Sequence, residues 1–581
     1  MDGLTTLHRW FQSGRYSLLG HADLPVHRGS MGLVIVPPFG WEDVSAYRPL
    51  RFVARKLAAN GIAVLRFDLP ATGDSSGDLS DPELFDCWIQ SVGDAAAELR
   101  ALTGVGRIAI FGVRVGATLA VAAASREANV QDLILWGAPA CGRAEFREMR
   151  AYASMERWEF DPDPPPGSQT ADGFEVGGFL IPPEMQRDWE GIDLTALPMN
   201  PRRVLLLSRD DISCDAKLVR SFESAGCAVQ TETGSGYSAM MRQPHEAAFP
   251  GAVADAILRF LAPSSCEKVR RLEIARASAA IEHAGARVTE SVHTVPMAEG
   301  PAFGIFTEPP PRLASSDWCV LFLNAGGVRH VGPNRMWVEA ARRHALRGIA
   351  SLRLDLLGIG ESDGPPALDI PDLYQEELVE QVERAIESLR SRGKFRRFAA
   401  VGLCSGAFWA FHAAFRNPEI RLAVLLNPRL FFWDPEADFR RAVRRGTKGL
   451  TNPADWWRVV RGGVQMDDLK RAARVALGTP QANFRDAFSH PQIPAERLAE
   501  TWQTIERNGS RMTLVFTERE PLLFEMEDEG RLPDESYSRI QLVRLGKAGH
   551  TFRPRWAQQI VYELIDREIQ SAVNEERVPA V

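Results

Sequence analysis

The chain has 581 residues, 45% of them hydrophobic and 25% charged, which is typical of a folded globular protein and excludes a mainly disordered chain. Its formal net charge of −7 argues against a broad nucleic-acid-binding surface. At roughly 150 residues per domain the length predicts several domains, and two large α/β domains fit equally well.

The first residues of the chain and the pattern of its cysteines bear on where in the cell the protein is expected. The first residues, MDGLTTLHRWFQSGRYSLLG, have no cationic start followed by a long apolar stretch, so we predict no signal peptide. No apolar run reaches the ~18 residues that a membrane span requires. The cysteines form no CxxC pair and have no His-rich neighbourhood, which disfavours a disulfide framework or a metal site and favours a cytoplasmic protein. The seven are Cys87, Cys141, Cys214, Cys227, Cys266, Cys319 and Cys404.

Two segments, 61–78 and 348–365, have the same pattern of glycine, aspartate and serine, and Asp68 recurs as Asp355, 287 residues later. An apolar run and a helical pattern precede each copy, and a second helix and a further apolar run follow it. We therefore predict two copies of one strand–helix–strand–helix–strand unit. Apolar runs that alternate with amphipathic helices predict a mostly parallel sheet with helices on both faces.

The repeat predicts two whole domains, because each copy is far longer than the repeat of a solenoid protein. We place the first domain at 1–264 and the second at 265–581. The boundary lies near residues 261–271, where proline and serine interrupt the pattern.

The last apolar run of each copy ends in a G-x-X-x-G turn that opens a helix, which is the layout of a nucleophile elbow. In the first copy the middle residue is Arg114, whose guanidinium stays protonated and cannot attack an acyl carbon. In the second copy it is Cys404. A helix N-terminus and a nearby base would lower the pKa of this thiol and make it a nucleophile. The alternative is a buried packing cysteine.

Together these motifs resemble the α/β-hydrolase superfamily, and the resemblance spans most of the chain. The first half, with PPFGWED (37–43) and FEVGGFLIPPEM (174–185), resembles the type 2 hydrolases associated with the exosortase A system. The second half, with AGGVRHVGPNR (325–335) and LLNPRLFFWD (425–434), resembles the type 1 hydrolases of that system. The type 1 elbow has the sequence G-L-C-x-G, so the resemblance places the nucleophile at Cys404. It implies two tandem α/β-hydrolase domains, each with a cap insertion.

In this fold the acid and the histidine follow the nucleophile in chain order. His550, after a strand and a Gly-rich turn, is expected to be the catalytic base. The family pattern places the acid at Glu520, and Glu518 and Asp528 remain alternatives. The acid would hold the imidazole in the useful tautomer.

The oxyanion hole needs two backbone N–H groups aimed at one oxygen. We expect one from Ser405 and the other from the loop after the first long strand, most simply from Gly326. Arg329 and His330 in the same loop are candidates to bind substrate. The hydroxyl of Ser405 is a rival nucleophile, although it lies one residue past the top of the turn.

A long insertion, about 430–505, is expected to form a basic cap. Within it, residues 440–474 contain ten Lys/Arg and three Asp/Glu, and Trp456 is a candidate substrate-binding residue. A basic, aromatic cap could attract an anionic substrate such as an acyl thioester of coenzyme A or of an acyl carrier protein. The alternative is a solvated amphipathic helix pair whose tryptophans close the core.

The first half lacks the chemistry of the second. The resemblance places Tyr237 where the catalytic histidine would stand, and Asp210 or Asp211 at the acid position. We expect Arg114 to form an ion pair with that carboxylate. The first domain is then catalytically inactive and serves as a scaffold that docks on the second. The alternative is that Arg114 binds a carboxylate or a phosphate.

We therefore predict a cytoplasmic acyltransferase or thioesterase that uses Cys404, His550 and Glu520 and forms an acyl-cysteine. The substrate would be an acyl thioester or a small ester. Two alternatives remain: a non-catalytic pseudo-hydrolase that binds or scaffolds partners in a biosynthetic system, and a Cys-dependent hydrolase of small esters or lactones. No metal, cofactor, nucleic acid or membrane span is predicted, and a homo-oligomer is left open.

Overall fold

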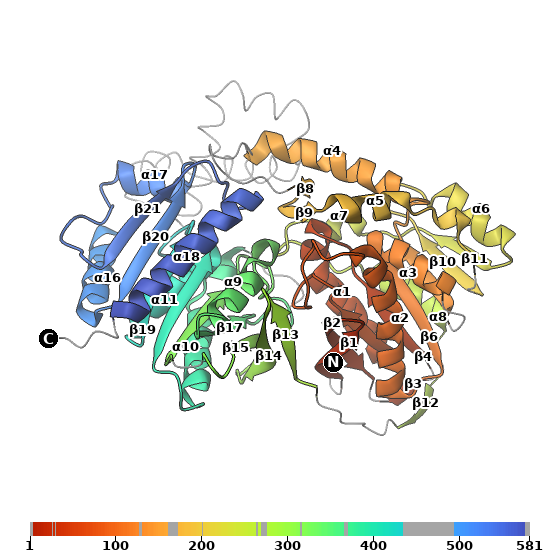
Figure 1. Ribbon diagram of the computed structural model, residues 1–581, viewed down its shortest axis with the longest axis horizontal. Coiled ribbons are helices and arrows are strands. Elements are labelled where there is room, and N and C mark those ends of the chain that lie inside the picture. Colours follow the sequence, from red (N-terminus) through yellow and green to blue (C-terminus); the bar gives the residue numbers. More distant parts are fainter. Residues whose placement is uncertain are drawn as a thin grey trace, which may run out of the picture.

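The computed structural model describes residues 4–25, 27–29, 31–126, 130–160, 172–199, 202–262, 265–268, 276–313, 316–364, 370–433 and 493–575. Two α/β domains follow one another along the chain, the first ending with β12 and the second beginning with β13 (Figure 1). Each holds a mostly parallel sheet flanked by helices, so the predicted fold class is confirmed. Among the described helices, none is long and apolar enough to cross a membrane.

The first domain is built on an eight-stranded sheet of order β1-β2-β5-β4-β6-β7-β10-β11, in which β2 runs antiparallel to both of its neighbours, β1 and β5, and the other pairs are parallel. Its strands are β1 (Thr5–Ser13), β2 (Tyr16–Leu24), β3 (His27–Gly29), β4 (Met31–Val36), β5 (Ala63–Phe67), β6 (Arg107–Val113), β7 (Val130–Trp136), β8 (Phe174–Val176), β9 (Phe179–Ile181), β10 (Arg203–Leu207), β11 (Ala228–Glu232) and β12 (Ser265–Lys268). Its helices are α1 (Trp41–Ala59), α2 (Leu84–Thr103), α3 (Val115–Arg126), α4 (Gly142–Phe160), α5 (Pro183–Gly191), η1 (Leu194–Ala196), α6 (Ala216–Ser224), α7 (Tyr237–Met240) and α8 (Gly251–Leu261).

The second domain repeats this order in a nine-stranded sheet, β13-β14-β15-β17-β16-β18-β19-β20-β21. Its strands are β13 (Ser278–His283), β14 (Ala286–Val295), β15 (Ala302–Glu308), β16 (Trp318–Leu323), β17 (Ala350–Leu354), β18 (Arg397–Leu403), β19 (Ile420–Leu426), β20 (Arg511–Thr517) and β21 (Ile540–Leu545). Its described helices are η2 (Pro333–Arg335), α9 (Met336–Ala345), η3 (Ile370–Tyr374), α10 (Glu376–Arg390), α11 (Ser405–Arg416), α16 (Ala495–Asn508), α17 (Pro521–Asp528) and α18 (Arg555–Glu575).

The central strands are buried on both faces, which is why they are continuous apolar runs rather than alternating ones. Every residue of β4 and of β16 is buried. In the first domain α2 and α3 cover one face of the sheet and α1 and α8 the other. In the second domain α10 and α11 cover one face and α9 and α18 the other. This layering brings the carboxyl ends of the parallel strands of each sheet to one edge, where loops can carry chemistry.

The two copies of the repeated segment face each other across the domain interface. Arg66 of β5 donates to both carboxylate oxygens of Glu361 at 2.7 and 3.0 Å. Arg353 of β17, the equivalent of Arg66, donates to Asp74, which is the equivalent of Glu361. The members of each equivalent pair are 287 residues apart. The interface therefore has the reciprocal contacts of a two-fold symmetric dimer within one chain.

A second reciprocal contact uses the backbone of the same loops. Arg48 of α1 donates to the carbonyls of Gly360 and Ser362, at 3.0 and 3.3 Å. Its equivalent, Arg335, donates to the carbonyls of Gly73 and Ser75, both at 2.8 Å. The domain docking expected from the sequence is thus present, and each loop binds arginines of the other domain.

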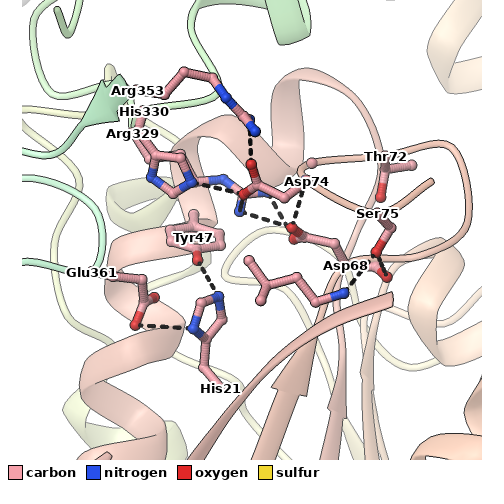
Figure 2. A network of polar contacts seen from close by, with 12 residues as sticks. His21, Tyr47, Asp68, Thr72, Asp74, Ser75, Arg329, His330, Arg353 and Glu361 are labelled. Carbon is pink, nitrogen blue, oxygen red and sulfur yellow. Dashed lines mark hydrogen bonds and ion pairs between the residues drawn. The ribbon is translucent and has the colours of Figure 1, made fainter. Parts of the chain in front are cut away.

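His330 joins the two domains at the centre of this interface (Figure 2). Its Nε2 lies 2.7 Å from the carboxylate of Asp74, and its Nδ1 lies 2.8 Å from that of Asp355. Burial favours the neutral imidazole, but the two carboxylates outweigh it and raise the pKa of His330 to about 9. Next to it, Arg329 donates to both oxygens of Asp68 at 3.1 and 2.8 Å. The side chain of His330 is 0% exposed, so its charge is paired without help from water.

We predict that the stability of the chain depends on pH through His330. Its pKa is about 9 in the folded chain and about 6.5 in an unfolded chain, so the folded state binds the proton more tightly. This contribution to the free energy of unfolding is complete below about pH 6.5 and is lost as the pH rises toward about 9. Thermal unfolding of the wild type and of His330→Gln across this range measures the effect.

The His330→Gln variant should unfold at a lower temperature near neutral pH and should lose the part of the pH dependence that His330 supplies. His293→Gln is the matched control, because burial lowers the pKa of this half-buried histidine to about 4 and it makes no interdomain ion pair that the structure records. Equal pH slopes for the wild type and His330→Gln would contradict the assignment.

Candidate active site

Cys404 stands at a sharp turn between β18 and α11. Its backbone has φ +58° and ψ −114°, a strained conformation for a residue with a side chain. A Cβ on Gly402 would lie 2.1 Å from the backbone of Gly406, and a Cβ on Gly406 would lie 2.3 Å from the carbonyl oxygen of Asn324. Only glycine fits at both positions. The two glycines thereby fix the turn that sets Cys404 at the end of the sheet.

His550 and Glu520 meet as the sequence predicts. The Nδ1 atom of His550 lies 2.9 Å from each carboxylate oxygen of Glu520. Glu520 is 4% exposed, and the hydroxyl of Thr517 donates to it at 3.2 Å. The alternative acids, Glu518 and Asp528, are exposed. Of the three carboxylates, Glu520 is the one in contact with the histidine.

The pKa values of Cys404 and His550 are shifted in opposite directions. Burial raises the pKa of the Cys404 thiol, but its interaction with His550 outweighs burial, and the pKa is lower than that of an ordinary thiol. Burial lowers the pKa of His550, but interactions with Cys404 and Glu520 raise it to about 10. The two shifts favour a thiolate with an imidazolium nearby, the state in which a cysteine is nucleophilic, and His550 Nε2 makes no direct hydrogen bond among the described residues.

Two neighbours of the thiol were not anticipated from the sequence. Arg429, an exposed residue after β19, and Tyr374 of η3 both help to lower the pKa of Cys404. Tyr374 is 3% exposed and packs edge-on against Phe408, with ring centroids 5.3 Å apart. Neither residue was assigned a role in the site from the sequence, because they come near the thiol only through the packing of η3 and the β19 loop.

Asn427, also missed by the sequence analysis, ties three parts of the site together. Its side-chain amide donates to the carbonyl of His550 at 2.8 Å, and its side-chain oxygen accepts from the N–H of Thr517 at 2.9 Å. It is fully buried and has φ +42°, a conformation that asparagine tolerates better than most residues. Two signals could have identified it: it is a polar residue directly after a strand, and it lies in the segment 425–434 that carries the family resemblance.

The loop that follows β16 differs in detail from the expectation. The N–H of Gly326 donates to the hydroxyl of Ser405 at 2.8 Å, so this expected oxyanion donor already has a partner. Ser405 is the first residue of α11, where backbone N–H groups have no acceptor within the helix. The Ser405 hydroxyl therefore accepts a hydrogen bond from the oxyanion loop.

The same loop is anchored at both ends. The side-chain amide of Asn324 donates to Asp355 at 3.0 Å, and Asp355 also binds His330. A Cβ on Gly327 would lie 2.7 Å from the backbone nitrogen of His245, which belongs to the first domain. Gly326 thus lies in a loop that both domains hold.

The residues expected to bind substrate lie elsewhere. Arg329 and His330 are buried in the domain interface, where carboxylates engage both side chains, which corrects the expectation that they line a pocket with Cys404. Acidic residues of the partner domain, which the local sequence could not reveal, account for the difference. Trp456 and most of the expected cap, including 440–474, lie outside the described residues.

The elbow of the first domain has the same geometry with a different side chain. Arg114 has φ +56°. Its guanidinium donates to Glu42 at 3.1 Å and to Glu148 at 2.7 Å. Tyr237, at the expected histidine position, donates to Glu42 at 2.8 Å. The predicted ion pair of Arg114 is therefore present, but with other partners than expected.

Asp210 and Asp211, the expected acids of the first domain, do not form that pair. The carboxylate of Asp210 accepts from the backbone N–H groups of Gly236 and Ser238 at 2.7 and 2.8 Å, and Asp211 is exposed. Glu42 lies in the first turn of α1 and Glu148 in α4, so tertiary packing supplies both partners.

Comparisons with known proteins relate part of the chain to one family. Residues 320–560 match the model of the alpha/beta hydrolase family, a range that includes Cys404, Glu520 and His550. Among solved structures, the chain is similar to Est1E from Butyrivibrio proteoclasticus, with 20% identity, a TM-score of 0.32, and coverage of 44% of this chain and 99% of that one. It is also similar to the alpha/beta hydrolase GrgF from Penicillium sp. sh18, with 17% identity, a TM-score of 0.32, and coverage of 49% and 98%. No curated protein matches. The match to the family model therefore falls within the second domain.

We predict that Asn427→Ala displaces His550 and weakens the activation of Cys404. The change removes both side-chain hydrogen bonds of Asn427 and places alanine at a positive φ, which costs about 1–2 kcal/mol. Because the thiol depends on the nearby imidazole, alkylation of Cys404 by iodoacetamide near neutral pH should slow several-fold. Mass spectrometry of the alkylated peptide measures this rate.

Asn417→Ala is the control, because Asn417 lies after the far end of α11 and its side chain accepts only from the N–H of Glu419 among the contacts recorded. This variant should leave the rate near that of the wild type. Unchanged labelling in Asn427→Ala would show that Asn427 does not position the histidine.

Proposed function

We propose that the second domain is an acyl-transfer enzyme, an acyltransferase or thioesterase, with Cys404 as nucleophile, His550 as base and Glu520 as the acid that orients it. The observation that carries the proposal is the contact of His550 with Glu520 on one side and its mutual pKa shift with Cys404 on the other. The family match over the same residues supports it.

In the first step the Cys404 thiolate attacks the acyl carbon, and the bond from that carbon to the leaving group breaks. The proton on His550 Nε2 passes to the leaving group, and the product is an acyl-cysteine thioester. In the second step His550 accepts a proton from water, an alcohol or an amine, which attacks the thioester and releases the thiolate. Glu520 holds the Nδ1 proton of His550 in both steps. The thioester keeps the acyl group activated for an acceptor, which favours acyl transfer.

The oxyanion that forms in each step needs backbone donors. The N–H of Ser405 at the start of α11 is suited to this role. Rotation of the Ser405 side chain away from Gly326 would release the second N–H, so the proposed hole is completed by one rotamer change. The residues above the thiol would determine which acyl groups and which leaving groups the site accepts.

The finer resemblance to the type 1 and type 2 hydrolases associated with the exosortase A system supports this division of roles between the domains. The expected substrates are acyl thioesters of coenzyme A or of an acyl carrier protein, or small esters. A thiol nucleophile works only while it is reduced, which fits the cytoplasmic location that the cysteine pattern predicts.

The first domain is, in this proposal, a scaffold without hydrolase activity. Its elbow residue Arg114 is bound by Glu42 and Glu148, which leaves no nucleophile there. Its Asp74 binds His330, and Asp355 binds both His330 and Asn324. His330 and Asn324 lie in the chain on either side of Gly326. The first domain thereby positions the oxyanion loop of the second.

We predict that Cys404 reacts faster with iodoacetamide than the other cysteines, with a pH midpoint below the ~8.5 of an ordinary thiol. Cys87, Cys214 and Cys227 are internal controls, because burial raises the pKa of each. His550→Ala should raise the pH midpoint of Cys404 and slow its labelling at pH 7 about tenfold or more. Equal and slow labelling of all cysteines would rule out a catalytic thiol.

Intact mass spectrometry after exposure to short and long acyl-coenzyme A esters is the direct test of covalent catalysis. Adducts should form on the wild type and be absent from Cys404→Ala. Adducts formed from oxygen esters alone would favour the small-ester hydrolase. No adduct and no turnover with either class would favour the non-catalytic binding protein.

We also predict that Asp74→Asn slows acylation without slowing alkylation. Loss of the Asp74 charge weakens the hold on His330 and so loosens the loop that carries Gly326. Acylation needs the oxyanion hole and should fall at least about tenfold, whereas iodoacetamide forms no oxyanion and should react at the wild-type rate. Both rates are measured on the full chain by mass spectrometry.

Asp317→Asn is the matched control, since Asp317 pairs with Arg397 at the half-exposed surface of the second domain. It should change neither rate. If Asp74→Asn lowered both rates together, its role would be structural stability alone, and if it lowered neither, Asp74 would not influence the loop. Either outcome would contradict the scaffold proposal for the loop.

A further inference from the structure

A cavity of about 580 Å³ lies between the two domains. The first domain contributes residues of the loop before α1, of the repeated loop at 71–80 and of β9. The second contributes residues of the loop at 328–335, of α9 and of α18. Cavities of this size commonly hold small molecules. Cys404, His550 and Glu520 do not line it, so it is distinct from the candidate active site.

The wall from the first domain is largely apolar, with Phe39, Leu79, Phe179 and Leu180 on the lining. Phe39 and Phe179 pack edge-on, with ring centroids 5.5 Å apart. The opposite wall, from α9 and α18, is polar. An occupant that satisfies both walls has an apolar body and a polar end.

The second domain's side of the cavity holds three buried donors that lack partners in the described structure: the Tyr562 hydroxyl of α18, Arg343 Nε of α9 and Asn334 Nδ2 of η2. Tyr562 is 7% exposed, and the guanidinium of Arg343 lies 5.4 Å from the centre of its ring. A buried donor without an acceptor is costly, about 1–3 kcal/mol for each group. The residues that carry these donors all line the cavity, so a ligand rich in acceptor oxygens is suited to supply the missing partner.

The charges near these donors favour an anion. Arg343 and Arg347 share the single carboxylate of Asp566, which leaves one positive charge in excess at this corner. Of the carboxylates on the lining, Glu339 is paired with Arg335 and Asp43 lies 3.5 Å from Arg329. Asp78 accepts from the neutral Ser80, and Arg555 adds a further positive charge to the lining. A phosphate or carboxylate on the occupant would compensate the excess charge and accept from the unpartnered donors.

We propose that this interdomain cavity is a binding site for an amphipathic anion, a molecule with an apolar body against Phe39, Phe179 and Leu180 and a phosphate or carboxylate held by Tyr562, Arg343 and Asn334. The site adjoins the loop that carries Gly326, because Val328 and Val331 line the cavity. It is independent of the thiol chemistry proposed for Cys404.

Isothermal titration of the full chain with decyl phosphate, below the concentration at which it forms micelles, tests the site. We expect one molecule to bind per chain. Inorganic phosphate, which lacks the apolar body, and decanol, which lacks the charge, should each bind at least about tenfold more weakly. Decanoate distinguishes a carboxylate-binding site from one that prefers phosphate. Equal affinity for inorganic phosphate or for decanol would overturn the amphipathic assignment.

Tyr562→Phe is the decisive variant, because it keeps the ring and removes only the unpartnered hydroxyl. It should weaken decyl phosphate binding several-fold without lowering the unfolding temperature. Arg343→Gln should weaken binding about tenfold or more, and Arg397→Gln, which alters a surface arginine of the same domain, should not. Unchanged binding in Tyr562→Phe and Arg343→Gln together would overturn the proposal.

The titration is repeated on Cys404→Ala to separate this site from the active site. Binding should be retained there, even if Cys404 proves to have no catalytic role. Loss of binding in Cys404→Ala, with full binding in Tyr562→Phe, would place the probe at the active site and overturn the second site.

Discussion

Reciprocal ion pairs between the two copies of one repeated segment hold this molecule together. Arg66 binds Glu361 in one direction, and the equivalent Arg353 binds Asp74 in the other. These groups are almost fully buried, so each charge depends on its partner in the other domain for compensation. Removing one partner while the domains stay docked would leave a buried charge unpaired, which is far more costly than losing a surface pair. The interface therefore fixes one relative orientation of the two sheets.

That constraint extends into the candidate active site. Asp74 of the first domain binds His330, His330 binds Asp355, and Asp355 binds Asn324 at the start of the loop that contains Gly326. The two elbows have the same turn, because a pair of glycines flanks the middle residue in both domains. One side chain then decides the chemistry: a thiol beside an imidazole at Cys404, and a guanidinium bound by two carboxylates at Arg114.

Some of the site could be predicted because its signals are local or ordered along the chain. The glycines around Cys404 report a tight turn, and the order nucleophile, acid, histidine directs attention to Glu520 and His550, which the structure brings into contact. Other parts could not. Arg329 and His330 were interpreted as pocket residues because a loop sequence does not reveal which carboxylates lie opposite. Neither Tyr374 nor Asn427 was assigned a role in the site, although Asn427 lies in the segment 425–434 that carries the family resemblance. The partner of Gly326 depends on the rotamer of Ser405.

The sequence by itself determined the two-fold repeat, the alternation of apolar strands and amphipathic helices, and the contrast between a cysteine and an arginine at equivalent turns. These features follow from the short-range spacing of apolar residues, from the backbone freedom of glycine and from the permanent charge of arginine. The tertiary structure alone decided that the repeated loops face each other, that Arg114 pairs with Glu42 and Glu148, and that a cavity with unpartnered donors lies between the domains. Such contacts join residues up to hundreds of positions apart, and their free energy depends on burial and geometry, which no local pattern of residues encodes.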